Sequence, residues 1–280
     1  MHSRYILIAL MPCVFGCVLS LNAYGAPTET EGPDALAKAR TQLRSGKFSD
    51  AIESFDKIIT ADPKCVDAYL GRARANMLTP DGARRSIADC DKAIDLEPKR
   101  AAAYDIRGTD FLILKDHEKA LKDFDSAVQL DSKNPRRYVI RGNAYHNLKR
   151  YPEALKDYDR AFELKPSEDI YVNRARVYDD LGEYEKALKD SNKAIELQAT
   201  KKTPIAALEA INYTNRGRAY LGLGEAEKAV TDLSKAASTN PRTVPGEAFY
   251  FRAKAYTKLG KAELATKDTE EAKKLGYKPE

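Results

Sequence analysis

Few residues in this 280-residue sequence have the type and spacing that catalysis or metal binding requires. The histidines are His2, His117 and His146, and none stands at zinc-ligand spacing from a carboxylate. The sequence has no glycine-rich phosphate loop and no serine nucleophile elbow, and no Cys-x-x-Cys motif follows residue 25. We therefore expect a protein that is not an enzyme and that binds no metal or cofactor.

Charged side chains, in contrast, recur in two rows with a step of about 34 residues. The first row is Arg72, Arg107, Arg141, Arg174, Arg216 and Arg252, and the second is Asp89, Asp123, Asp157, Asp190, Asp232 and Asp268. A guanidinium can bind a carboxylate through two parallel hydrogen bonds, so the rows could pair with each other or bind a ligand. The first copy has Lys38 and Ser54 at these two places and so lacks both members together. We predict a structural Arg–Asp pair within each copy, which fixes the register of its helices.

Both rows belong to a unit that is repeated seven times. A small residue opens the second half of each copy, at Ala51, Ser86, Ala120, Ala154, Ala187, Ala229 and Ala265, with steps of 35, 34, 34, 33, 42 and 36 residues. An aromatic residue of the first half keeps the same steps from Tyr69 onward. Each copy reads as two amphipathic helices, which must stack on neighbouring pairs to bury their apolar faces.

The most regular copy carries Tyr138, Gly142, Tyr145, Ala154, Tyr158, Ala161 and Pro166. This pattern resembles the tetratricopeptide repeat (TPR) family, and the resemblance spans about residues 32–278. It implies an all-α, right-handed superhelical solenoid of about seven helix-turn-helix hairpins. Thr269 and Ser191 depart from the pattern, because the family has an aromatic residue there.

The repeat register divides the chain. We expect a signal peptide at residues 1–25, a short linker at 26–31 and the solenoid at 32–280, with copies at about 32–65, 66–100, 101–134, 135–167, 168–201, 204–243 and 246–279. The 42-residue step places about eight extra residues before the sixth copy, near Lys201–Leu208. Thr203-Pro204 is typical of a helix start, so the first helix of this copy is predicted to begin early, near Pro204.

The resemblance also implies that the first helices line a concave surface and that a third row points into it. This row is Arg40, Arg74, Thr109, Asn143, Arg176, Arg218 and Lys254, and five of its seven members are cationic. Asn173, Asn215 and Tyr250 are further candidate contacts. Asn143 and Asn173 match two places of a carboxylate clamp known in the family, but Ile211 and Asn215 stand where its cations would be. We predict that the surface binds a protein or peptide segment of acidic character; a merely solvated helix face is the alternative.

The N-terminal segment indicates export. Residues 5–21 are apolar and uncharged after Arg4, and Ala23-Tyr24-Gly25 is a small-x-small triplet that favours cleavage after Gly25. Val14-Phe15-Gly16-Cys17 resembles a lipobox, so lipidation at Cys17 and a role in a bacterial envelope or secretion complex is the alternative. Either reading places the protein in the periplasm or outside the cell, without a transmembrane segment in the mature chain.

Composition narrows the partner classes further. The net charge of +5 is too balanced for nucleic acid to be a default partner. Two cysteines, Cys65 and Cys90, follow the signal segment, and we expect one in a turn and one buried rather than a disulfide, with pairing as the alternative. The oligomeric state stays open; end-to-end self-assembly is a further possibility for a solenoid. The sequence thus predicts an exported, non-catalytic adaptor.

Overall fold

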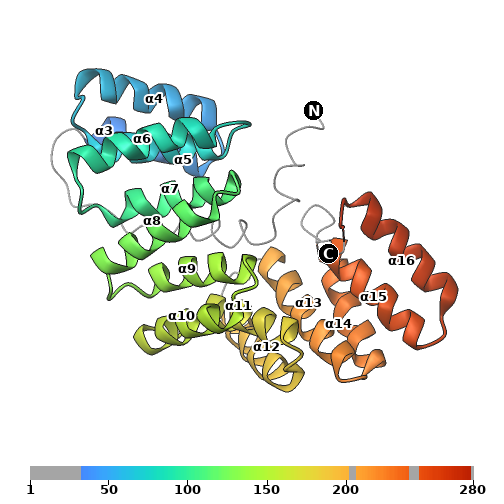
Figure 1. Cartoon of the computed structure of the whole chain (residues 1–280). Helices are drawn as coiled ribbons and strands as arrows, with labels where there is room; N and C mark the ends of the chain where they lie inside the picture. Colours follow the sequence, from blue (N-terminus) through green and yellow to red (C-terminus); the bar gives the residue numbers. More distant parts are fainter. Residues whose placement is uncertain (1–32, 202–205, 240–245, 279–280) are drawn as a thin grey trace. The chain divides into compact units, whose positions relative to one another are not determined.

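The computed structural model describes residues 33–201, 206–239 and 246–278, and within these ranges it contains fourteen α-helices and no strand (Figure 1). The predicted signal segment 1–25, the linker and Cys17 lie outside the described residues. The described residues form two compact units, which divide between Lys149 and Arg150, and this boundary falls between the two helices of the fourth copy. None of the described helices is long and apolar enough to span a membrane.

The N-terminal unit contains the first three hairpins and one more helix. Its elements are α3 (Pro33–Arg44), α4 (Phe48–Ala61), α5 (Val66–Met77), α6 (Ala83–Leu96), α7 (Ala101–Ile113), α8 (His117–Leu130) and α9 (Pro135–Asn147). Each helix contacts the next one, and the first helices α3, α5, α7 and α9 also contact one another in turn. The unit therefore has two layers, one of first helices and one of second helices.

The C-terminal unit repeats this arrangement. Its elements are α10 (Tyr151–Leu164), α11 (Glu168–Asp180), α12 (Tyr184–Ala199), α13 (Ala206–Gly222), α14 (Ala226–Ser238), α15 (Gly246–Lys258) and α16 (Ala262–Lys274). The first helices α11, α13 and α15 again touch in sequence, so side chains on their shared layer can form one continuous surface. All fourteen helices were expected from the repeat register.

The turn inside each described hairpin uses a left-handed residue. Glycine takes this conformation between α3 and α4 and in the three C-terminal hairpins, for example Gly182 with φ +76°. Three turns use residues with a Cβ instead, Asp81 with φ 54°, Lys115 with φ 61° and Lys149 with φ 57°. Left-handed backbone costs a residue with a Cβ about 1 kcal/mol or more.

The core lies between the two layers and is built of small residues that let helices approach closely. In the N-terminal unit, Ala51, Phe55 and Ala75 are fully or almost fully buried in one apolar cluster. Gly108 of α7 lies directly over the ring of Phe124 in α8, where an added Cβ would come 2.7 Å from Phe124 Cε1. The glycine and alanine columns of the sequence therefore set the distance between the helices.

The insertion before the sixth copy lengthens its first helix. α13 has 17 residues, whereas the other first helices have 12 or 13. Its predicted start at Pro204 lies outside the described residues. Just after the added turn lies the buried Asn212, whose Nδ2 donates to Glu168 Oε1 at 2.9 Å and to Gln198 Oε1 at 2.5 Å. Lys201 also pairs with Glu168, so the insertion is tied to the start of α11 and the end of α12.

Candidate partner-binding surface

The two charged rows of the sequence meet in the structure. In copy five, Arg174 donates from Nε to Asp190 Oδ2 at 2.7 Å and from Nη2 to Asp190 Oδ1 at 3.1 Å. The same within-copy pairs form between Arg72 and Asp89, Arg107 and Asp123, Arg216 and Asp232, and Arg252 and Asp268. Arg141 and Asp157 belong to different units, so their pairing stays a prediction.

Each of these arginines also reaches back to the preceding copy, which the sequence argument missed. Arg174 Nη1 donates to Asp159 Oδ1 at 2.7 Å, two residues beyond the place of the within-copy aspartate. The acceptors along the chain are Asp56, Asp91, Asp125, Asp159, Asn192 and Ser234. The first four acceptors are carboxylates and form ion pairs with the arginine of the next copy. Asn192 and Ser234 are neutral, so copies five and six are linked to the next copy by a hydrogen bond without an ion pair.

Aromatic rings hold the guanidinium in place. The Arg174 guanidinium carbon lies 5.9 Å from the ring centroids of both Tyr171 and Tyr178, one turn before and one turn after it. Such cation–π contacts explain why the aromatic and arginine columns share one register. The hydroxyl of Tyr104, which belongs to the same column as Tyr171, donates to the carbonyl of Pro98 at 2.9 Å and so closes the turn between copies.

The electrostatics of the rows favour a structural role. Burial raises the pKa of Asp89 although its hydrogen bond with Arg72 lowers it, whereas that hydrogen bond raises the pKa of Arg72. Desolvation of the carboxylate thus offsets much of the attraction, and the net contribution to stability is small. The pair specifies which residues must face each other, and it leaves no free charge for a ligand.

The C-terminal unit presents a different surface on its first helices. Tyr250, Phe251 and Lys254 lie on one face of α15; the two rings meet edge to face at 5.2 Å, and Lys254 Nζ lies 4.7 Å from the Tyr250 centroid. Arg176 of α11 and Arg218 of α13 belong to the same row as Lys254. With Tyr277, which follows α16, we call these six residues the aromatic–cationic surface. Lys254 is exposed and Tyr250 is half-buried.

Arg218 lies at the base of this surface and is paired inside the protein. Its Nη1 donates to Glu247 Oε1 at 2.8 Å, and its Nη2 lies 2.6 Å from Asp179 Oδ2 and 2.8 Å from Asp180 Oδ1. Burial lowers the pKa of Arg218, but the three carboxylates together raise it above its ordinary value. Only 11% of the side chain is exposed, so Arg218 positions α11, α13 and α15 and its guanidinium is already occupied.

Phe251 and Tyr277 are the members of the surface that were not selected from the sequence. The ring centroid of Tyr277 lies 5.1 Å from that of Tyr250. Burial raises the pKa of Tyr277 to about 12, with a further contribution from the nearby charge of Glu247. The signal that could have found it is its place just after the glycine that ends α16.

The other candidate contacts fall into two groups. Asn143 and Asn215 are buried, with 7% and 5% exposure, and Asn215 Nδ2 donates to the carbonyl of Val172 at 3.2 Å. Asn143 and Asn215, like Arg218, are therefore packed inside the protein, and their predicted role as contacts of a partner is wrong. Arg74, Asn173 and Arg176 are half-buried. Arg40 is partly exposed and shares Asp67 with Arg100, at 3.0 Å and 2.6 Å.

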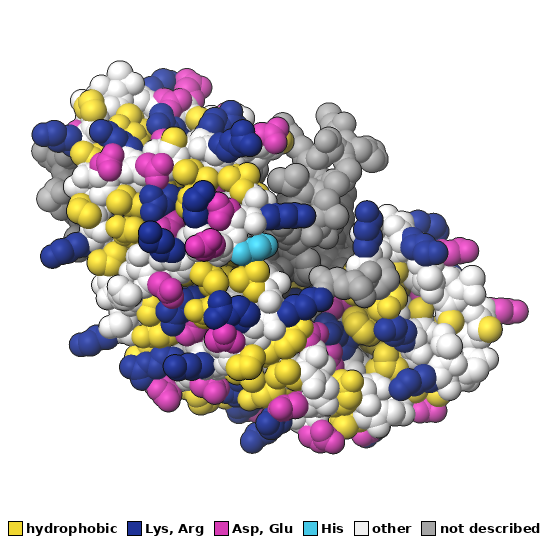
Figure 2. All heavy atoms as spheres, viewed as in Figure 1, with side chains coloured by type: hydrophobic (Ala, Val, Ile, Leu, Met, Phe, Trp, Pro, Cys, Tyr) yellow, Lys and Arg dark blue, Asp and Glu magenta, His cyan; other side chains and the backbone are white. Residues whose placement is uncertain are grey.

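Charges of both signs are interspersed over the visible helices of each unit (Figure 2). The cations of the third row therefore lie beside carboxylates instead of forming a basic trough. His117 is exposed at the start of α8, not packed in the turn as its aromatic position would suggest. Cys65 and Cys90 are both free thiols, and Cys90 is buried.

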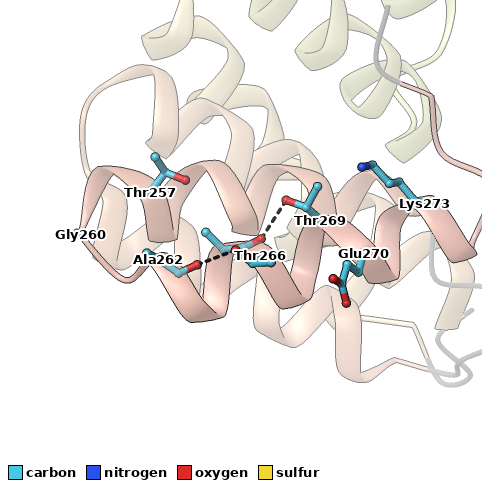
Figure 3. A pocket seen from close by; sticks show the side chains of 8 residues that line it. Thr257, Gly260, Ala262, Thr266, Thr269, Glu270 and Lys273 are labelled. Carbon is cyan, nitrogen blue, oxygen red and sulfur yellow. Dashed lines mark hydrogen bonds between the residues drawn. The ribbon is translucent and has the colours of Figure 1, made fainter.

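A hollow in the seventh hairpin is lined by residues of α15, α16 and the turn between them (Figure 3). Thr266 and Thr269 line it, and their hydroxyls donate to the carbonyls of Ala262 at 3.1 Å and Ala265 at 2.8 Å. In the other second helices the place of Thr266 is taken by Leu, Ile or Val. The hydroxyls are satisfied within the helix, and Lys273 adds a charge to the rim, so this hollow is a polar end face of the repeat array.

Stacked helical hairpins with a shared layer of first helices define a helical-repeat interaction scaffold. The chain belongs to the tetratricopeptide repeat family: sequence models of the tetratricopeptide repeat match residues 36–84, 135–168, 168–201 and 210–243. TPR proteins are in general non-catalytic scaffolds for protein–protein interaction. No curated protein matches this sequence significantly.

Solved structures support the same fold. A tetratricopeptide repeat protein from Parabacteroides merdae is 19% identical, with a TM-score of 0.67 over 87% of this chain and 93% of its own. A chain of the APC/C hetero-tetramer Cut9–Hcn1 gives a TM-score of 0.73 at 16% identity, over 98% of this chain and 50% of the other. PilW, a type IV pilus biogenesis factor, gives 0.64 at 16% identity, over 76% and 98%. These similarities concern the fold alone.

Proposed function

We propose that the protein is an exported, non-catalytic adaptor that holds a partner protein through an extended segment bound on its first helices. The observation that carries the proposal is the aromatic–cationic surface. There, half-buried aromatic rings and an exposed lysine ammonium lie together on the layer of first helices, and aromatic residues are enriched among those that dominate binding energy in protein interfaces. A preformed surface also limits the entropy that binding must overcome.

The charges favour an acidic segment. Lys254 has no carboxylate within ion-pair distance among the described residues, and its ammonium lies over the Tyr250 and Phe251 rings. Glu247, Asp179 and Asp180 are bound to the Arg218 guanidinium and not to Lys254. The Lys254 ammonium is therefore left to pair with a partner carboxylate.

The test is crosslinking in cells followed by capture of the mature chain. The surface variant is Arg176→Glu/Lys254→Glu, and the matched control is Lys261→Glu/Lys267→Glu, which makes the same charge change at exposed positions of α16 and the turn before it. Arg218 is left intact, because its reversal would place a fourth carboxylate in a buried cluster. Both variants must melt at the wild-type temperature.

We expect the wild type and the control to capture one partner and the surface variant to lose it. Capture of the same partner by all three would refute a site on this surface. Sequencing of the mature N-terminus in the same cells tests export, since cleavage after Gly25 leaves Ala26 as the first residue. An uncleaved N-terminus would contradict export by this route.

A second candidate function is a lipid-anchored subunit of an envelope assembly or secretion complex. The lipobox-like residues Val14–Cys17 favour it, and PilW, whose fold is similar, is described as a pilus biogenesis factor. Mass spectrometry of the N-terminal peptide separates the two candidates, because a diacylated Cys17 at the N-terminus supports the second and an unmodified Ala26 the first.

A further inference from the structure

The segment after α16 folds back onto the first-helix layer. Gly276 has φ +76°, and its N–H donates to the carbonyl of Lys273 at 2.9 Å. The N–H of Tyr277 donates to the carbonyl of Ala272 at 3.0 Å. These two bonds form the left-handed glycine cap that commonly ends a helix. The cap turns the chain so that Tyr277 points back toward the start of α15.

A glycine on α15 makes room for this residue. An added Cβ at Gly246 would come 2.7 Å from Tyr277 Cβ and 3.0 Å from the carbonyl oxygen of Ala272. Gly246 and Tyr277 therefore lie in direct contact. The Tyr277 ring then packs against Tyr250 at 5.1 Å with an interplanar angle of 41°, and it lies in the field of Glu247, Arg218 and Arg176.

The contacts that hold the ring are few. Within the described ranges the Tyr277 hydroxyl makes no hydrogen bond, and the residue is only half-buried. The backbone cap depends on Gly276 and not on the ring. The ring can thus leave Tyr250 while α16 and its cap stay folded.

We infer that Tyr277 occupies the place of a partner's aromatic side chain, so that the segment which fits this surface carries a tyrosine or phenylalanine next to a carboxylate. This inference rests on the proposed function and names its ligand class. The incoming ring takes the position of Tyr277 against Tyr250, and the carboxylate meets the Lys254 ammonium. Binding therefore requires Tyr277 to move away, and the tail competes with the partner.

The sequence contains no tryptophan, so Tyr277→Trp places a single tryptophan reporter in the tail of the full mature chain. Two acetylated peptides are titrated against it, Glu-Glu-Tyr-Glu-Glu and Glu-Glu-Ala-Glu-Glu, which differ only in the ring. We expect the free protein to emit at shorter wavelength than tryptophan in water, because the ring is seated. The tyrosine peptide shifts the emission to longer wavelength, and the alanine peptide at the same concentration does not.

Calorimetry on Tyr277→Ala measures the competition directly, with Tyr277→Phe as the control that keeps the ring. If the tail is seated in about nine molecules of ten, its removal tightens the tyrosine peptide about tenfold, and Tyr277→Phe binds as the wild type does. Tyr250→Ala in the tryptophan background abolishes both the seated emission and the shift.

The inference is overturned if the free reporter already emits as in water, if both peptides act alike, or if Tyr277→Ala binds no tighter than the wild type. These outcomes leave the capture experiment intact, because a partner can bind elsewhere on the first helices. If instead the tyrosine peptide shifts the emission as expected but the surface variant captures the same partner as the wild type, the proposed cellular role is refuted and the ligand class is retained.

Discussion

The interface between copies two and three contains a buried acid at a place that alanine takes in other described interfaces. Asp110 of α7 and Ser86 of α6 are both 0% exposed. At the equivalent places, Ala51 and Ala75 lie together in one apolar cluster, as do the alanine pairs Ala120–Ala144 and Ala229–Ala255 in theirs. Asp110 is thus a carboxyl group in a position built for a methyl group.

Burial raises the pKa of Asp110 from 3.8 to about 8, and the nearby Ser86 hydroxyl lowers this pKa only partly. The folded state therefore binds this proton more tightly than the unfolded state does. The contribution of Asp110 to the free energy of unfolding is highest below about pH 4, falls as the pH rises and is constant above about pH 8. A shift of about 4 pKa units at 1.36 kcal/mol each sets an upper limit of about 6 kcal/mol.

The perturbation is Ser86→Ala/Asp110→Ala, which restores the pair found in the other interfaces. We expect its stability advantage over the wild type to grow by up to about 4 kcal/mol between pH 5 and pH 8. Urea unfolding followed by circular dichroism measures this advantage. Hydrogen exchange of α6 and α7 localises it, since repeat arrays need not unfold in one step. Asp95→Ala, at an exposed position of α6, is the control and should show no such trend.

A pH-independent difference between the double variant and the wild type would refute the reasoning. It would mean that Asp110 is ionised in the folded state and that nearby groups stabilise its charge. A double variant that is less stable at pH 8 would show instead that the carboxyl group stabilises this interface.

Three further predictions follow from the geometry. Asp190→Asn should lower the free energy of unfolding by about 2 kcal/mol, because the Asp190 side chain is only 6% exposed. Asp159→Asn should change it by no more than about 0.5 kcal/mol, because the Asp159 side chain is 56% exposed. Equal losses in urea unfolding would contradict the difference between a buried partner, Asp190, and a solvated one, Asp159. Lys115→Gly should raise stability by about 1 kcal/mol, since Lys115 has φ 61°; a lower melting temperature would contradict this. Burial raises the pKa of the Cys90 thiol, so in the chain from residue 26 onward a disulfide reagent at pH 8 should modify Cys65 in the folded protein and Cys90 only in urea; equal rates would show that α6 opens readily.

Much of the fold could be predicted from the sequence because the same pattern of small and aromatic residues occurs in seven copies. A single copy such as Tyr138–Pro166 would not identify the fold, but a register kept by both small and aromatic residues requires stacked hairpins. The within-copy partners of the arginines could be inferred for the same reason, since the first copy lacks both members. The signal segment and its alternative at Cys17 depend on the sequence alone and stay predictions.

The candidate surface was predictable only in part. Lys254 and Tyr250 are accessible, as a row on the first helices suggests, whereas Asn143, Asn215 and Arg218 are buried. Helix periodicity places a residue on a face, but it does not say how near the next helix comes. The burial of Arg218 depends on three carboxylates from α11 and α15 that have no fixed sequence distance from it.

The helices, their order and their pairing into hairpins follow from the sequence, because they depend on spacings of three, four and about 34 residues. The pairing of individual charges, the complete burial of Asp110 and the contact of Tyr277 with Tyr250 are seen only in the tertiary structure. These features depend on distances between residues of different helices. Such distances arise only when the helices pack, because packing removes water and brings together groups that no local pattern relates.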